Sequence, residues 1–183
     1  PDAIFTYDPS YRNKNIIQKY TESDIDAPIV FGSSVAFEIL DSDIDKFKYH
    51  FLLNQDKLSE FLLKKHYNKK NIQDSPSVAI ITLQILIKLG FGNIYFAGQN
   101  LGFLNGERYS DGIDNNFISN KITEKEKKDN IVIEDVNGNE MITNKSYYGM
   151  KQTLEKYIKN YSNINFINTT KYGADIKGTK YKE

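Results

Sequence analysis

Residues 77–100 read SVAIITLQILIKLGFGNIYFAGQN, a long apolar run followed by a shorter one. In the first run Ser77, Gln84 and Lys88 form a narrow polar strip, which predicts a helix that is buried almost all round. The second run, 93–97, has the length and composition of a buried strand. A buried helix leading into a buried strand is typical of sheets whose strands are joined by helical crossovers.

The ends of this helix also have sequence signals. Ser75 is predicted to cap it, with Pro76 at the first helical position, and Gly90 is predicted to end it. The first turn of a buried helix presents unpaired N–H groups, so Ser75 and Ser77 are candidates for binding an anion there. Capping alone explains these serines equally well.

Five short runs are apolar on successive residues, as expected for strands that helices cover on both faces. They are 3–7, 28–31, 49–53, 93–97 and 163–167. Helical patterns lie between several of them, including one apolar stripe of Leu58, Phe61, Leu62 and Tyr67 and another within 150–161. This alternation predicts an α/β fold of three layers, Rossmann-like, with a mostly parallel sheet flanked by helices.

Two segments fall outside that alternation. Residues 131–136 and 139–143 flank Asn137-Gly138, the preferred pair of a two-residue primed turn, and predict an accessory antiparallel β-hairpin. Residues 122–130 are charged and lack an apolar face, so we expect a solvated stretch.

Length and composition narrow the class of protein. The 183 residues suit a single Rossmann-like domain, and the start at Pro1 predicts a fragment of a larger protein. Lys+Arg and Asp+Glu are equal at 24, so we expect neither nucleic acid nor a membrane as partner. The absence of cysteine excludes disulfides and thiolate metal sites and favours the cytoplasm. No apolar run is long enough to span a bilayer.

Polar residues follow four of the predicted strands, and ligands of open parallel sheets collect at such strand ends. The candidates for ligand binding are Ser33, Ser34, Gln99, Asn100, Asn168 and Thr169, and Asp8 follows the first strand. These residue types also occur there as ordinary caps, which stays the alternative for each.

The loop 101–116 is long enough to act as a lid, and within it Arg108 could meet a phosphate or carboxylate. His50 and His66 have no serine or carboxylate partner at a telling spacing, so both are expected to be structural or solvated. No spacing of side chains indicates a metal site.

Several segments together resemble the motility accessory factor (Maf) family of flagellin glycosyltransferases and the related 6-hydroxymethylpterin pyrophosphokinase MptE-like domain. They are PDAIFTYDP (1–9), SPSVA (75–79) with IKLG (87–90), IYFAGQNL (94–101), YSDG (109–112) and INTTKYGADIKG (167–178). The glycine-rich segment that such domains carry upstream of the first strand is absent, and Asn100 stands where many relatives have aspartate.

The resemblance implies transfer of a nonulosonic, sialic-acid-like sugar from a CMP-activated donor to Ser or Thr hydroxyls of flagellin. On that basis Asp8 and Tyr109 are the catalytic candidates, and no tightly bound cofactor is expected beyond the donor, with room for Mg²⁺. One alternative is a Mg²⁺-dependent pyrophosphokinase acting on a hydroxymethylpterin. Another is a non-catalytic module that binds sugar or flagellin.

Overall fold

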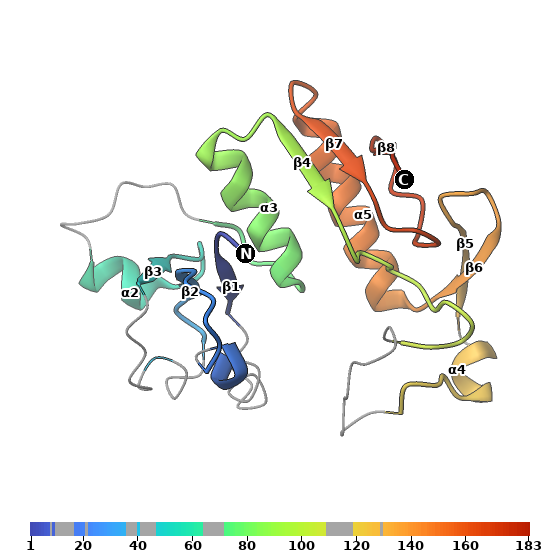
Figure 1. Ribbon diagram of the computed structural model, residues 1–183, viewed down its shortest axis with the longest axis horizontal. Coiled ribbons are helices and arrows are strands. Elements are labelled where there is room, and N and C mark those ends of the chain that lie inside the picture. The colour runs from blue at the N-terminus through green and yellow to red at the C-terminus, as the bar shows by residue number, and fades with distance from the viewer. Residues whose placement is uncertain are drawn as a thin grey trace. The chain divides into compact units, whose positions relative to one another are not determined.

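The computed structural model describes residues 1–7, 9, 17–20, 22–35, 40, 47–63, 72–108, 119–128 and 130–183. The chain divides into two compact units, unit 1 (1–85) and unit 2 (86–183), and the boundary lies within one helix. Each unit is built on its own parallel sheet (Figure 1). The α/β class with parallel strands and flanking helices is therefore confirmed.

Unit 1 is a three-stranded parallel sheet in the order β1-β2-β3. Its strands are β1 (Ile4–Thr6), β2 (Ile29–Gly32) and β3 (Lys48–Phe51), followed by helices α2 (Lys57–Leu62) and α3 (Val78–Leu89). Two clusters of buried side chains form the core, one around Ile29 and Val35 and the other around Phe51, Leu53 and Ile81. The three predicted strands of this unit are confirmed.

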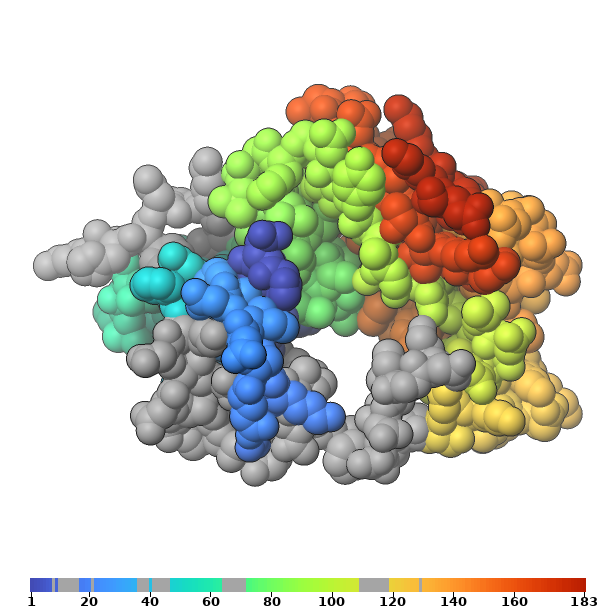
Figure 2. Space-filling view, in the orientation of Figure 1, coloured from blue at the N-terminus to red at the C-terminus, as the bar shows by residue number. Residues whose placement is uncertain are grey.

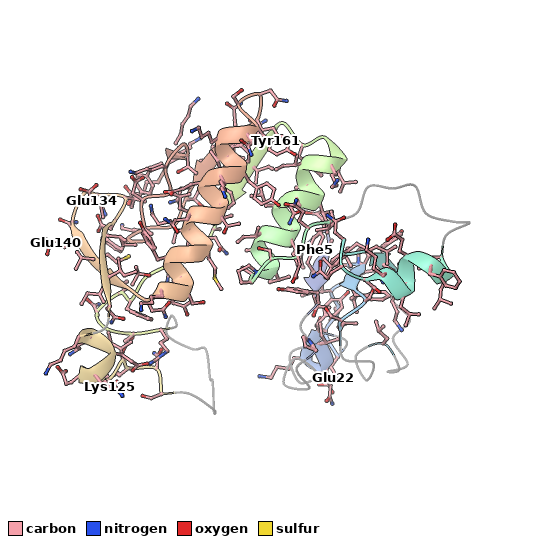
Figure 3. The ribbon with its side chains drawn as sticks, turned by 180° about the vertical axis from the view of Figure 1, so that it is seen from behind. Phe5, Glu22, Lys125, Glu134, Glu140 and Tyr161 are labelled. Carbon is pink, nitrogen blue, oxygen red and sulfur yellow. The ribbon has the colours of Figure 1, made fainter. Side chains whose placement is uncertain are left out.

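Unit 2 contains a second three-stranded parallel sheet, in the order β4-β7-β8. Its elements are β4 (Asn93–Phe96), α4 (Glu124–Lys128), β5 (Ile131–Glu134), β6 (Glu140–Thr143), α5 (Lys145–Asn160), β7 (Asn165–Asn168) and β8 (Lys180–Tyr181). Figures 1 and 3 show α5 alongside one face of this sheet. Residues near the C-terminus, coloured red, lie on the face seen in Figure 2.

Helix α3 begins at Val78, two residues later than the predicted first position Pro76. Ser77 is the capping residue, because its Oγ accepts a hydrogen bond from the Ala79 N–H at 3.2 Å and its carbonyl accepts from Ile80 and Ile81. The prediction of Ser75 as the cap is wrong. The predicted end is confirmed, since Gly90 follows with a φ of 86°, in the left-handed region.

The hairpin is confirmed, but its turn differs from the prediction. Asp135 N–H donates to Asn139 O at 2.9 Å and Gly138 N–H donates to Asp135 O at 3.0 Å, which closes a three-residue loop. Gly138 has a positive φ of 81°, and Asn137 does not have a positive φ. A type I′ turn needs a positive φ at both central residues. The Asp135 carboxylate stabilises the wider loop by accepting from the N–H groups of Asn137 and Asn139, each at 2.8 Å.

Two further segments have features that the sequence patterns did not predict, although the charged stretch is solvated as expected. The stripe of α2 faces solvent, with Leu58, Phe61 and Leu62 each about 70% exposed, while Tyr67 lies outside the described residues. The charged stretch contains α4, which a capping box begins: Thr123 Oγ1 accepts from Glu126 N–H, and Glu126 Oε2 accepts from Thr123 N–H. Within the described part of the chain no helix is long and apolar enough to cross a membrane.

Candidate functional site

A pocket of about 740 Å³ opens at the carboxyl ends of the unit 1 strands. We call it the strand-end pocket. Its lining includes Tyr7, Ser33, Ser34, Asp56, Asp74 and Ser75. The volume lies in the range of sites for small molecules, and the position is where ligands of parallel sheets collect.

The parallel register brings Ser33 and His50 together across β2 and β3. Phe31 pairs with His50 in the sheet, and Ser33 follows two residues later at the strand end. The Ser33 hydroxyl and the His50 Nε2 are hydrogen-bonded at 2.7 Å. The imidazole also stacks on the Phe31 ring, with centroids 5.0 Å apart, which fixes its orientation.

Asp56 adds a carboxylate beside this pair. As the cap of α2, it accepts a hydrogen bond from the Ser59 N–H through Oδ1 at 3.0 Å. Its Oδ2 is buried and has no hydrogen-bond partner among the described residues. The nearby Ser33 hydroxyl, which is hydrogen-bonded to His50, is the main cause that lowers the pKa of Asp56.

Burial sets the charge of the imidazole. Removal from water lowers the pKa of His50, and the Asp56 carboxylate partly opposes this. The lowered pKa of His50 favours the neutral imidazole at pH 7, and a neutral imidazole can accept a proton. Ser33 and Asp56 line the strand-end pocket, and His50 is hydrogen-bonded to Ser33, so a hydroxyl, a base and an anion lie close together at its edge.

Ser75 forms another wall of the pocket. The residue is 6% exposed, and its Oγ has no hydrogen-bond partner among the described residues. The Tyr7 hydroxyl donates to the Ser75 carbonyl, and the Ser34 hydroxyl donates to the Tyr7 carbonyl at 2.6 Å. These bonds tie the ends of β1 and β2 to the segment before α3. A buried hydroxyl without a partner inside a pocket is suited to a ligand.

The predicted site residues fall into three groups. Ser33, Ser34 and Ser75 lie together in the strand-end pocket, whereas Ser77 caps α3 and is absent from its lining. The two catalytic candidates, Asp8 and Tyr109, lie outside the described residues. The remaining candidates belong to unit 2.

In unit 2 the polar strand ends bond mainly to one another. Asn168 is fully buried; its side-chain amide donates to Ala174 O at 3.2 Å and accepts from Thr170 N–H at 3.0 Å. The Thr169 hydroxyl donates to Phe96 O at 3.0 Å. The Gln99 N–H donates to Thr170 Oγ1, and the Asn100 carbonyl accepts from Ala174 N–H. These bonds brace the loop after β7, and ligand-binding roles for these residues stay predictions.

The Arg108 guanidinium has protein partners. It donates to the carbonyls of Ser119 and Lys121 at 2.9 Å each and forms an ion pair with Glu126. Its side chain is 13% exposed. This arrangement holds the segment before α4 against the loop that follows β4, and a role for Arg108 toward a ligand stays a prediction.

Sequence reasoning missed His50 and Asp56. His50 was expected to lack a serine partner because Ser33 is 17 positions away, and only the strand register brings the two together. Asp56 could have been predicted, because it follows the third strand and the same rule of polar strand ends applies to it. Among the residues that the structure describes, no group of three or more histidine or acidic side chains could hold a metal ion.

The fold is that of a Rossmann-like α/β protein with a pocket at the strand ends of unit 1. Residues 1–106, more than half of the 183, match the family described as 6-hydroxymethylpterin diphosphokinase MptE-like, and the chain belongs to that family. Every described residue of the strand-end pocket lies within this match. No curated protein matches the chain.

The structure is also similar to that of the Maf glycosyltransferase from Magnetospirillum magneticum AMB-1. The TM-score is 0.72 at 16% sequence identity, and the alignment covers 100% of this chain and 26% of that one. The predicted resemblance is thus confirmed for family and fold. The chain spans about a quarter of the length of that glycosyltransferase.

Proposed function

We propose that this chain is a glycosyltransferase-like domain that moves a nonulosonic sugar from a CMP-activated donor to Ser or Thr hydroxyls of flagellin. The observation that carries the proposal is the group formed by Ser33 and Asp56, which line the strand-end pocket, and His50, which is hydrogen-bonded to Ser33. The fold shared with a Maf glycosyltransferase supports it. We place the activity in the cytoplasm, which suits a chain without cysteine.

In the proposed reaction the oxygen of the acceptor hydroxyl attacks the anomeric carbon of the sugar. The bond from that carbon to the phosphate oxygen breaks, and its electrons leave with CMP. The neutral His50 Nε2 takes the hydroxyl proton, with the Ser33 hydroxyl yielding its hydrogen bond to the acceptor. The Asp56 carboxylate stabilises the positive charge that develops on the imidazole and on the sugar.

Calorimetric titration of the full chain with CMP, CDP and ATP, each with and without Mg²⁺, tests the proposal. We expect binding that is selective for CMP and is lost in Ser75→Ala, whose hydroxyl lies unpartnered in the pocket. His50→Gln should keep CMP binding while lowering sugar transfer on the order of a hundredfold, the usual contribution of a positioned base. His66→Gln is the matched control. Absence of CMP binding would overturn the proposal.

A second candidate function is a Mg²⁺-dependent pyrophosphokinase acting on a hydroxymethylpterin, with the chemistry that the family description names. The carboxylates of Asp56 and Asp74 favour it, because both lie in the strand-end pocket and oxygen ligands suit Mg²⁺ beside phosphates. ATP binding that requires Mg²⁺ and disappears in Asp56→Asn would identify this function. The first candidate predicts no such requirement.

A third candidate function is a non-catalytic module that binds sugar or flagellin, and it predicts different assay results. Flagellin binding would then survive Ser33→Ala, His50→Gln and Asp56→Asn, and no transfer would be detected with any donor. Measuring flagellin binding and sugar transfer on the same three variants separates this module from the transferase.

A further inference from the structure

A second cavity, which lies in unit 2, has no part in the proposed reaction. Its volume is about 1140 Å³, and it is lined by α5, the start of β7 and the C-terminal segment. Asn165 and Phe166 open it at the amino end of β7, whereas Asn168 lies at the carboxyl end of the same strand. The cavity is therefore separate from the polar strand ends of this sheet.

Four lysines line the cavity, and we call it the lysine groove: Lys156 and Lys159 on α5, and Lys177 and Lys180 on the C-terminal segment. All four are exposed, and none forms an ion pair with a described residue. The one carboxylate in the lining, Glu155, is already neutralised. Its Oε1 accepts from Lys151 Nζ at 2.5 Å and from the Lys177 N–H at 2.9 Å.

The lysine groove lies where α5 and the C-terminal segment are in close contact. Gly178 has a φ of 90°, and a Cβ there would lie 2.7 Å from Ile158 Cγ2. Ile158, Ile164 and Phe166 add apolar surface to the lining. In Figure 3 the labelled Tyr161 marks the end of α5 that the groove borders.

Because the four lysines are exposed, each can contribute only weakly to binding an anion, and this favours a ligand with several negative charges. A single exposed ion pair contributes about 0 to 1 kcal/mol, so a small ion gains little from them. An extended chain that carries several carboxylates meets all four ammonium groups and can place an apolar side chain on the groove floor. We propose that the lysine groove docks an acidic, partly apolar peptide segment of a protein partner, independently of the proposed transfer reaction.

Fluorescence anisotropy with a short labelled peptide of glutamate and leucine residues tests this on the full chain. We expect binding that weakens as salt is added, because exposed charges are screened. Lys156→Gln/Lys159→Gln and Lys177→Gln/Lys180→Gln should each weaken it about tenfold, the summed effect of two exposed ion pairs. Circular dichroism confirms that each variant is folded.

The matched control is Lys125→Gln/Lys128→Gln, which removes the same charge from α4, outside the lysine groove. Unchanged affinity in this control supports the groove. Equal weakening in it, or binding of a single-stranded DNA oligomer of equal charge as tightly as the peptide, would overturn the proposal. Absence of peptide binding at low salt would do the same.

Discussion

Burial lowers the pKa of the His50 imidazole, and the Asp56 carboxylate only partly offsets that effect. Between the lowered value and the ordinary 6.5, the unfolded chain binds more protons than the folded chain. The free energy of unfolding therefore rises with pH through this window. The contribution is fully present above pH 6.5 and is lost as the pH falls through the pKa of the folded state.

NMR titration can measure this directly, because the chain has two histidines and His66→Gln leaves only one. The remaining imidazole should titrate below 6.5. Ser33→Ala tests the hydrogen bond in the same way, and the shift should persist there because its main cause is burial. A titration midpoint at or above 6.5 in the His66→Gln protein would contradict the neutral base.

Glu126 gives a second pH effect, in unit 2. The hydrogen bond from Arg108 is the main cause that lowers its pKa from 4.5 to about 2, and the bonds from Thr123 add to it. The folded state thus binds fewer protons than the unfolded state between these values, and the stabilisation is lost as the pH falls from about 4.5 to about 2. We expect the protection factor of the Thr123 amide, which donates to Glu126, to fall as the pH decreases through this range.

Glu126→Gln should make the same amide exchange rapid at neutral pH. Glu124→Gln is the control, because Glu124 is an exposed side chain of the same helix that pairs with Lys127. Hydrogen exchange that is slow in Glu126→Gln would show that the capping box does not hold the start of α4.

Helix α3 offers a matched pair of serines at its first turn. Ser77→Ala removes the hydroxyl that accepts from Ala79 and should lower the free energy of unfolding by about 1 kcal/mol. Ser75→Ala removes a buried hydroxyl without a described partner and should leave stability unchanged or raise it. Urea unfolding of both variants checks this, and the opposite order would restore Ser75 as the cap.

The elements most accessible to sequence reasoning were those fixed by local patterns. Buried strands show as apolar runs, and α3 shows as an apolar helix ended by Gly90. The hairpin turn was predicted too short because the Asp135 side chain, absent from the usual turn rule, bonds to Asn137 and Asn139. The apolar stripe of α2 was predictable as a pattern, but its exposure was not, because spacing alone cannot tell which surface a helix faces.

The candidate site divides in the same way. Ser33, Ser34 and Ser75 were predictable because strand ends and a helix start place polar residues in a pocket. The pairing of Ser33 with His50 depends on the register of two parallel strands, which no spacing along the chain reveals. The ion pair of Arg108 with Glu126 depends likewise on how a loop folds back.

For the molecule as a whole, charge balance and exposed apolar surface act together. The formal net charge is zero at pH 7, and Leu58, Phe61 and Leu62 lie exposed on α2. A protein without net charge repels its own copies weakly, and an exposed apolar stripe favours association. We expect concentration-dependent association near pH 7, measurable by light scattering.

Phe61→Lys should reduce this association without loss of stability, because the side chain is 71% exposed. Gln55→Lys adds the same charge and leaves the stripe intact, so it serves as the control. An equal reduction in the control would assign the effect to net charge and not to the stripe.

The hairpin loop also affects deamidation, a slow chemical change of asparagine side chains. An asparagine followed by glycine deamidates when the glycine nitrogen attacks the asparagine side chain, and Asn137 and Gly138 form such a pair on the surface. Here the Gly138 N–H donates to the Asp135 carbonyl and the Asn137 N–H to the Asp135 carboxylate, so the attacking nitrogen is held in the turn. We therefore expect the hydrogen bonds to Asp135 to slow deamidation of Asn137 in the folded chain.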